Sequence, residues 1–365
     1  MNQVEYTEQN SINNLKDIIK KENKSKILLV KGKNSYEKSG LKNKIEKLLE
    51  NKQLIHFRDY ELNPKLENII NGIKLFQKEN PEIIIAAGGG SAIDVAKLIK
   101  YYNNINTDDL DKLIINKTKI KTENKIPLIA IPTTAGTGSE ATHFAVVYVN
   151  NQKYSVADES ILPEYVILES KYTKTVPKNI AASAGIDALC QAIESYWSVN
   201  STEESKQYAK KAMRLANENI VKAVTQKDDN SLEKMLLASN YAGKAINISK
   251  TTAPHALSYY ITSTYNIPHG HAVGLNLLRV MKINYNVNEE NINDKRGIDY
   301  VKKTIQEIFE ILNCKDLNDF EKRFNNIMDT IGLEKDIANI TDENFENLLK
   351  KVNLERLKNN PAMVV

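Results

Sequence analysis

The pattern of apolar residues changes near residue 178, and this change constrains the fold more than any other feature of the 365-residue chain. Before it, short apolar runs alternate with stretches that carry apolar residues at helical spacing. Strands that alternate with helices are typical of βαβ units and a parallel sheet. The expected strands are 26–31, 54–60, 82–87 and 127–132, and the expected helices are 41–49, 68–79 and 92–102.

After residue 178 the chain shows long helical stretches and few strand signals. The expected helices are 180–198, 203–224, 231–248, 270–284, 298–312, 317–331 and 343–357. A chain of this length is long for a single hydrophobic core. We therefore expect two domains, an α/β domain over residues 1–178 and an all-α domain over residues 179–365.

Charge and cysteine usage exclude several classes of protein. The 50 basic residues face 46 acidic ones and form no dominant block, so a dedicated nucleic-acid-binding protein is not expected. The chain has no run of 18 apolar residues, and its first 21 residues lack the apolar core of a signal peptide. Cys190 and Cys314 form no CxxC pair. These features predict a cytoplasmic protein with reduced thiols and no membrane span.

Two glycine-rich turns follow expected strands. The first, Gly88-Gly-Gly-Ser91, precedes a helix, whose free N–H groups and dipole suit a phosphate. Ser91 is the expected N-cap, and Asp94 resembles its partner in a capping box. The second turn spans residues 133–139. Two such turns at one sheet edge favour a dinucleotide site, although a tight turn without a ligand is the alternative, and the standard GxGxxG fingerprint is absent.

Four residues form a candidate metal site. Two of the five histidines, His255 and His269, lie 14 residues apart. Asp187 and Gln191 are four residues apart in an expected helix and therefore share a face. One carboxylate and two imidazoles make a reasonable first shell for a divalent metal, to which an amide oxygen adds a weak ligand. The alternative is a surface aspartate with structural histidines, because sequence alone does not show that these segments meet.

Four motifs together resemble the iron-containing (group III) alcohol dehydrogenase family. They are GGGSAIDVAK at 88–97, IPTTAGTGSE at 131–140, GIDAL at 185–189, and His255 followed by PHG at 268–270. Their order and spacing match the family over residues 25–361. The resemblance implies a dehydroquinate synthase-like architecture: a Rossmann-like nucleotide-binding domain, then an α-helical metal-binding and substrate domain. It further implies an active site in the cleft between the domains and a homodimer.

Within the family, residues 192–200, 250–259 and 262–271 resemble those of the phosphonoacetaldehyde reductases. This implies metal-assisted reduction of an aldehyde to a primary alcohol by NAD(P)H, with phosphonoacetaldehyde giving 2-hydroxyethylphosphonate. One alternative is a general short-chain alcohol or aldehyde dehydrogenase of the same family. Two others come from different classes: a dehydroquinate-synthase-like lyase and a non-catalytic nucleotide-binding module.

The family's metal ligands map onto Asp187, position 191, His255 and His269. Position 191 is normally histidine, and here it is glutamine. Since an amide oxygen is a poorer ligand for Fe²⁺ or Zn²⁺ than imidazole, we expect three protein ligands with a weak or absent fourth. Many members carry a second histidine four residues after the first, and Tyr259 stands there. Tyr259, His271 or a chain of waters is the expected proton relay.

The resemblance also implies the residues that hold the cofactor: Gly88, Gly89, Gly90, Ser91, Asp94, Thr133, Thr134, Thr137, Thr142 and Lys153. The turn after the first strand has no acidic residue for a ribose 2′-hydroxyl, whereas Lys31, Lys33 and Ser35 suit a 2′-phosphate. NADP(H) is therefore favoured over NAD(H), with solvated lysines as the alternative. A phosphonate substrate needs cationic partners, for which Lys250, Arg279 and His271 are the candidates.

Overall fold

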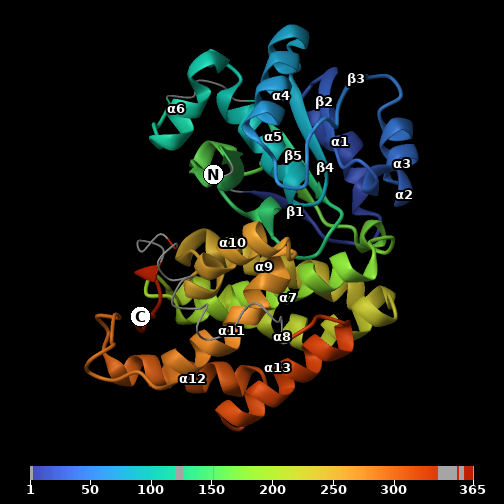
Figure 1. Ribbon diagram of the computed structural model, residues 1–365. Helices are drawn as coiled ribbons and strands as arrows, with labels where there is room; N and C mark the ends of the chain where they lie inside the picture. The colour runs from blue at the N-terminus through green and yellow to red at the C-terminus, as the bar shows by residue number, and fades with distance from the viewer. Residues whose placement is uncertain (1–2, 121–125, 151, 336–351, 353–356, 365) are drawn as a thin grey trace. The chain divides into compact units, whose positions relative to one another are not determined.

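The computed structural model describes residues 3–120, 126–150, 152–335, 352 and 357–364 (Figure 1). The chain divides into two compact units. One comprises Met1–Thr134 and Ser139–Val176, and the other comprises Ala135–Gly138 and Pro177–Val365. The helix expected over 343–357 lies almost wholly outside the described residues. Among those described, no helix has the length and apolar character that a membrane span requires.

The first unit is built on a six-stranded sheet in the order β1-β8-β5-β4-β2-β3, with all neighbouring strands parallel. The strands are β1 (Val4–Tyr6), β2 (Lys26–Lys31), β3 (Gln53–Phe57), β4 (Ile83–Gly88), β5 (Leu128–Pro132) and β8 (Tyr165–Ile167). Every residue of β4 and β5 is buried, as expected for strands covered on both faces. The strand expected over 54–60 ends earlier, at Phe57.

Helices cover both faces of this sheet (Figure 1). They are α1 (Asn14–Lys21), α2 (Ser35–Lys38), α3 (Leu41–Leu48), α4 (Leu66–Glu79), α5 (Gly90–Tyr102) and α6 (Leu110–Ile115). Residues of α1, α2 and α3 share one core with β2, β4 and β5, while α5 packs on the same strands and on α4. A hairpin of β6 (Phe144–Val149) and β7 (Gln152–Ala157) packs against α5 and α6. Short 3-10 helices occur at Ser11–Asn13, Thr107–Asp109, Ser139–Ala141, Glu159–Ile161 and Ser170–Thr173.

Helices are the main elements of the second unit in its described residues, which also include an isolated bridge between Ile292 and Ala362. Its helices are α7 (Lys178–Trp197), α8 (Glu203–Thr225), α9 (Asp229–Ser249), α10 (Ala253–Tyr265), α11 (His269–Tyr285), α12 (Ile298–Ile311) and α13 (Leu317–Ile331). The helix α7 contacts α8, α9, α11, α12 and α13, so it is buried on nearly all sides from Ala182 onward. Polar side chains on this helix are therefore removed from water.

The predicted fold class, a parallel α/β sheet followed by an all-α part, is confirmed. The first six expected helices of the second half begin and end within two residues of the observed bounds. The helix α10 was not predicted. Its sequence, APHALSYYITSTY, is rich in β-branched and aromatic residues, which weaken a helical signal.

Candidate metal and cofactor sites

Three helices of the second unit bring the candidate metal ligands together. Asp187 lies on α7, His255 on α10, and His269 is the first residue of α11. One ligand atom from each of these residues lies within 4.8 Å of the other two. Asp187 Oδ1 is 3.3 Å from His255 Nε2, and the two imidazole rings meet edge to face with centroids 5.3 Å apart. Asp187 and His255 are buried, and His269 is partly buried.

Close packing of α11 on α7 makes this arrangement possible. Gly270 follows His269, and a Cβ at this position would overlap the carbonyl oxygen of Ser183 and lie 2.7 Å from the Cβ of Asp187. Only glycine permits this approach of the two backbones. On α10, Pro254 occupies the first turn, where its missing N–H is not needed. The start of each helix therefore carries one histidine toward Asp187.

Two buried oxygens of the site have no hydrogen-bond partner within the described part of the chain: Asp187 Oδ1 and Gln191 Oε1. Gln191 Nε2 donates to Asp187 Oδ2 at 3.0 Å, which assigns the amide orientation and leaves its oxygen unused. Buried acceptors without partners are costly, and a bound cation would satisfy both. Carboxylate, amide oxygen and two imidazoles are donors that divalent transition metals accept, so these residues fit a metal ion.

A carboxylate that was not predicted as a site residue, that of Glu194, lies beside Nδ1 of His255. Glu194 is fully buried, and its Oε1 is 2.5 Å from His255 Nδ1. Burial disfavours the charged imidazole, but Glu194, and then Asp187, raise the pKa of His255 to about 9. The available signal was spacing, since Glu194 lies at i+7 from Asp187 on the same helix and therefore shares its face.

The two proposed proton-relay residues have different surroundings. The ring of Tyr259 stacks on that of His269, with centroids 5.7 Å apart and planes 6° from parallel. In contrast, His271 Nε2 donates to the carbonyl oxygen of Glu334 at 2.7 Å. Tyr259 thus stacks on a candidate metal ligand, whereas the ring of His271 is bonded to a backbone carbonyl.

The other two cationic substrate candidates, Lys250 and Arg279, lie on different elements. Lys250 is exposed and immediately precedes the segment that leads into α10, and its backbone adopts φ 63° and ψ 173°, a strained conformation for a residue with a side chain. Asn359 Nδ2 donates to the carbonyl oxygens on either side, those of Ser249 and Thr251, at 2.8 and 2.9 Å. Arg279, on α11, lines a separate surface hollow together with Glu321 and Lys335.

The expected capping box at the first glycine-rich turn is wrong. Helix α5 begins at Gly90 with Gly89 as its N-cap, and no side chain caps it. Instead, the Ser91 hydroxyl donates to the carbonyl oxygen of Leu62. The Asp94 carboxylate accepts from Ser139 Oγ at 2.6 Å and from the Val146 N–H at 3.1 Å. Both side chains have tertiary partners, so the start of α5 keeps its uncapped N–H groups available to an anion.

Glycine at position 88 is required by packing. A Cβ there would lie 2.6 Å from that of Ala92 and 3.0 Å from the backbone nitrogen of Gly32, where β4, β2 and α5 converge. Thr134 lies beside Gly89, and Thr133 is buried with its hydroxyl unpartnered among the described residues. The close packing of β2, β4 and α5 therefore explains why residue 88 is glycine. Gly89 and Gly90 add no side chain at the start of α5.

Of the remaining predicted cofactor residues, Thr142 and Lys153 lie in the first unit and Thr137 lies in the helical unit. Thr142 accepts from Lys97 Nζ at 3.0 Å, in a buried cluster where burial lowers the pKa of Lys97 to about 8. Lys153, on β7, is a charged neighbour of Asp94. Thr137 lies in the segment Ala135–Gly138, which belongs to the helical unit. There a Cβ on Gly138 would lie 2.6 Å from Gly243 Cα, so this glycine serves packing on α9.

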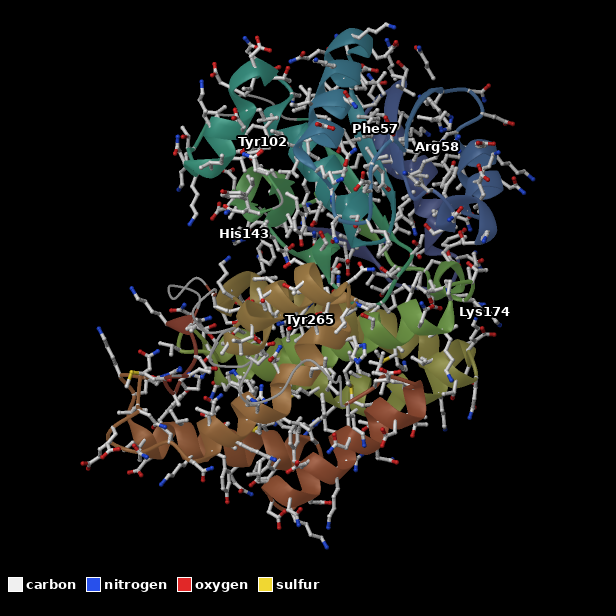
Figure 2. The ribbon with its side chains drawn as sticks, in the orientation of Figure 1. Phe57, Arg58, Tyr102, His143, Lys174 and Tyr265 are labelled. Carbon is white, nitrogen blue, oxygen red and sulfur yellow. The ribbon has the colours of Figure 1, made fainter. Side chains whose placement is uncertain are left out.

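A group of cations lies at the ends of β2 and β3. Lys31 ends β2, and its Nζ is 4.9 Å from the ring centroid of Tyr36. Lys33 is exposed and Ser35 begins α2. Arg58 directly follows β3 (Figure 2), whose Phe57 is in register with Val30. Burial, and then the charge of Arg58, lower the pKa of Lys31. Arg58 was missed because only the sheet order makes it a neighbour of Lys31.

Comparison with known proteins gives consistent matches. The iron-containing alcohol dehydrogenase family matches residues 4–170, and the C-terminal domain of that family matches residues 181–364. An NADPH-dependent butanol dehydrogenase of Clostridium saccharobutylicum is 30% identical over 71% of this chain and 68% of its own. A phosphonoacetaldehyde reductase of Streptomyces viridochromogenes is 30% identical over 61% of this chain and 58% of its own.

Solved structures agree with these matches. The crystal structure of sulfoacetaldehyde reductase from Bifidobacterium kashiwanohense in complex with NAD⁺ superposes with a TM-score of 0.88, at 27% identity over 100% of this chain and 94% of its own. The matched region is only 27% of the length of several aldehyde-alcohol dehydrogenases. The resemblance based on the four motifs is confirmed, and the chain belongs to the iron-containing alcohol dehydrogenase family.

Proposed function

We propose that the protein reduces an aldehyde to a primary alcohol, with NAD(P)H as reductant and Fe²⁺ or Zn²⁺ as metal. The observation that carries this proposal is the buried group of Asp187, His255 and His269, with the unpartnered oxygens of Asp187 and Gln191 beside it. Family membership supports the reaction class. Gln191 is proposed as a weak fourth ligand through Oε1.

Each residue of the site has a distinct proposed task. When bound, the metal would supply Lewis-acid polarisation of a carbonyl oxygen and the nicotinamide would supply hydride. Asp187, His255 and His269, from three helices, would hold the ion. The phenol of Tyr259, stacked on His269, is the proposed donor of the proton to the product oxygen. His271 is not proposed for this step, because its Nε2 is bonded to a backbone carbonyl.

For the cofactor, we propose that the N-terminus of α5 and the turn at Gly88 to Ser91 receive the pyrophosphate. Lys31, Lys33 and Arg58 then favour the 2′-phosphate of NADP(H), since Arg58 lies near Lys31 and residues 31–35 include no carboxylate for a ribose hydroxyl. The relatives support both cofactors: one is named an NADPH-dependent enzyme, and the solved reductase contains NAD⁺.

For the substrate, we propose a short aldehyde with an anionic tail, most specifically phosphonoacetaldehyde. Two of the relatives are named for aldehydes of this kind, one with a phosphonate and one with a sulfonate group. Lys250 is the proposed contact for the anion, because it precedes His255 by five residues and Asn359 fixes the carbonyls on both sides of it. A neutral short-chain aldehyde is the second candidate, favoured by the butanol dehydrogenase relative.

The decisive experiment is NADPH and NADH oxidation with phosphonoacetaldehyde, sulfoacetaldehyde and butyraldehyde. It uses metal-depleted protein, with and without added Fe²⁺ or Zn²⁺. No turnover of any aldehyde would overturn the proposed function, and turnover without NAD(P)H consumption would favour the lyase alternative. Lys250→Ala should lose more activity on phosphonoacetaldehyde than on butyraldehyde, and equal losses would remove Lys250 from the substrate site. The proposed homodimer is tested separately by analytical ultracentrifugation.

A further inference from the structure

We propose that Glu194 is a positioning residue that holds His255 with its proton on Nδ1 and its Nε2 free for the metal ion. The inference rests on the metal centre of the proposed function. Histidine has two ring nitrogens, and the partner of one nitrogen decides which atom is left to bind a metal. Glu194 therefore acts on the metal through His255 and makes no contact with substrate.

Distances on the two sides of the imidazole support this assignment. On one side, His255 Nδ1 is 2.5 Å from Glu194 Oε1. On the other side, His255 Nε2 is 3.3 Å from Asp187 Oδ1, within the group that binds the ion. A carboxylate only accepts hydrogen bonds at neutral pH, so the hydrogen of this short contact lies on Nδ1. Metal binding takes up the neutral ring, which then presents its lone pair at Nε2.

Hydrogen-bond donors hold one carboxylate oxygen of Glu194 and leave the other for His255. Its Oε2 accepts from the N–H of Thr252 at 2.8 Å and from Thr252 Oγ1 at 3.1 Å. The same hydroxyl oxygen accepts from Trp197 Nε1 at 2.8 Å. Glu194, Thr252 and Trp197 are all buried. Oε1 is thereby directed at His255, and the carboxylate cannot turn away without breaking buried hydrogen bonds.

Charge balance also supports this role of Glu194. A buried carboxylate is costly unless it is paired. With both imidazoles neutral, Asp187 and Glu194 give the site two negative charges, which a divalent ion neutralises. Replacement of Glu194 by glutamine removes one of these charges while keeping an acceptor of nearly the same size. The variant therefore separates the electrostatic role from the packing role.

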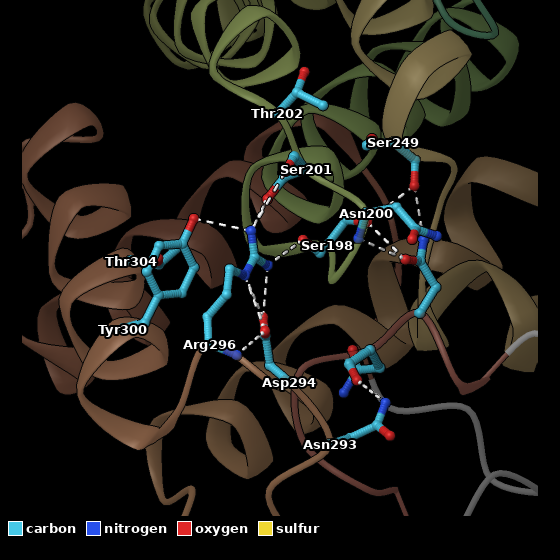
Figure 3. Close-up of polar contacts among 12 residues, drawn as sticks. Ser198, Asn200, Ser201, Thr202, Ser249, Asn293, Asp294, Arg296, Tyr300 and Thr304 are labelled. Atoms are coloured by element: carbon cyan, nitrogen blue, oxygen red, sulfur yellow. Dashed lines mark hydrogen bonds and ion pairs between the residues drawn. The ribbon is translucent and has the colours of Figure 1, made fainter.

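The test is metal affinity measured without substrate, by competition with a chromophoric chelator for Zn²⁺. We expect Glu194→Gln to bind the ion roughly 10–100-fold more weakly than the unchanged protein. Thr252→Val should also weaken binding, whereas Thr252→Ser, which keeps the hydroxyl, should bind nearly as the unchanged protein does. Asp294→Asn is the matched control, because Asp294 is also a buried carboxylate but is paired with Arg296 and not with an imidazole (Figure 3).

The outcomes separate this inference from the proposed reaction. Glu194→Gln protein that is folded by circular dichroism and binds Zn²⁺ with unchanged affinity would overturn it. If that variant does not fold, equal affinities of Thr252→Val and Thr252→Ser would overturn it instead. An equal loss of affinity in Asp294→Asn would show a general effect of buried charge and would also overturn it. If the unchanged protein binds Zn²⁺ but turns over no aldehyde, only the proposed reaction is rejected. If it binds no Zn²⁺, both the proposed reaction and the role of Glu194 are rejected.

Discussion

Replacement of Gly270 by alanine should disturb the metal centre through packing alone. Gly270 is the second residue of α11 and lies against α7. The added Cβ would overlap the carbonyl oxygen of Ser183 and lie 2.7 Å from the Cβ of Asp187. The carbonyl belongs to the backbone of a buried helix and has no room to yield. The start of α11 must therefore move away from α7, and His269 moves with it.

The magnitude follows from the two opposing effects of the methyl group. Overpacking of a well-packed interior costs about 1–3 kcal/mol. Glycine to alanine in a helix interior returns at most ~1 kcal/mol, and less in the first turn, where Gly270 lies. With about 0.5 kcal/mol returned in the first turn, a net loss of roughly 0.5–2.5 kcal/mol lowers the melting temperature by about 1–10 °C for a unit of this size. Displacement of His269 should also weaken metal binding about tenfold or more, because ligand geometry is demanding.

The assay is thermal unfolding in the presence of chelator, followed by Zn²⁺ affinity of the folded variant. Gly274→Ala is the matched control one turn further along α11. A Cβ at that position would lie 3.3 Å from Ile186 Cγ1 and from Met328 Sδ and Cε, and flexible side-chain ends can yield. We expect this control to be close to neutral. If Gly270→Ala equals Gly274→Ala in both melting temperature and affinity, the packing argument is refuted.

Three further predictions concern the site. Gln191→His should tighten Zn²⁺ binding by about tenfold, because imidazole replaces an amide oxygen, and an unchanged affinity in chelator competition would show that residue 191 is not a ligand. Arg58→Ala should raise the KM for NADPH by about tenfold or more and leave that for NADH nearly constant, whereas parallel changes would contradict a 2′-phosphate contact. In metal-free protein the pKa of His255 is raised from 6.5 to about 9. Its charge therefore stabilises the fold fully below pH 6.5, and this contribution is lost as pH rises through about 9. The difference in melting temperature between unchanged protein and His255→Gln should shrink over this range, and a constant difference would refute the assignment.

Sequence periodicity was sufficient for the architecture. Strands buried on both faces leave continuous apolar runs, as in 82–87 and 127–132, and these predicted a parallel sheet. Helices with one apolar face leave a 3.6-residue repeat, which located most helices of the second half closely. Both signals are local, since each depends only on residues near one another in the chain. The helix α10 was missed for the same reason, because its composition obscures the local repeat.

The candidate metal ligands could be named from residue type and family motifs, but their convergence depends on the packing of α7, α10 and α11. Capping at Ser91 and Asp94 was mispredicted because partners distant in sequence, Leu62 and Ser139, take up both side chains. Glu194 was not predicted as a site residue, because its role depends on the imidazole of His255, which only the tertiary structure places beside it.

The sequence by itself determined the alternation of strands and helices in the first half, the run of helices in the second half, the glycine-rich turns and the types of residue available for chemistry. Tertiary structure decided which of those residues meet. It joined Asp187 to His255 and His269, left Gln191 Oε1 and Asp187 Oδ1 unpartnered among the described residues, and placed Arg58 beside Lys31. The physical reason is that secondary structure follows from neighbouring residues, whereas a site depends on close packing between helices and strands far apart in the chain.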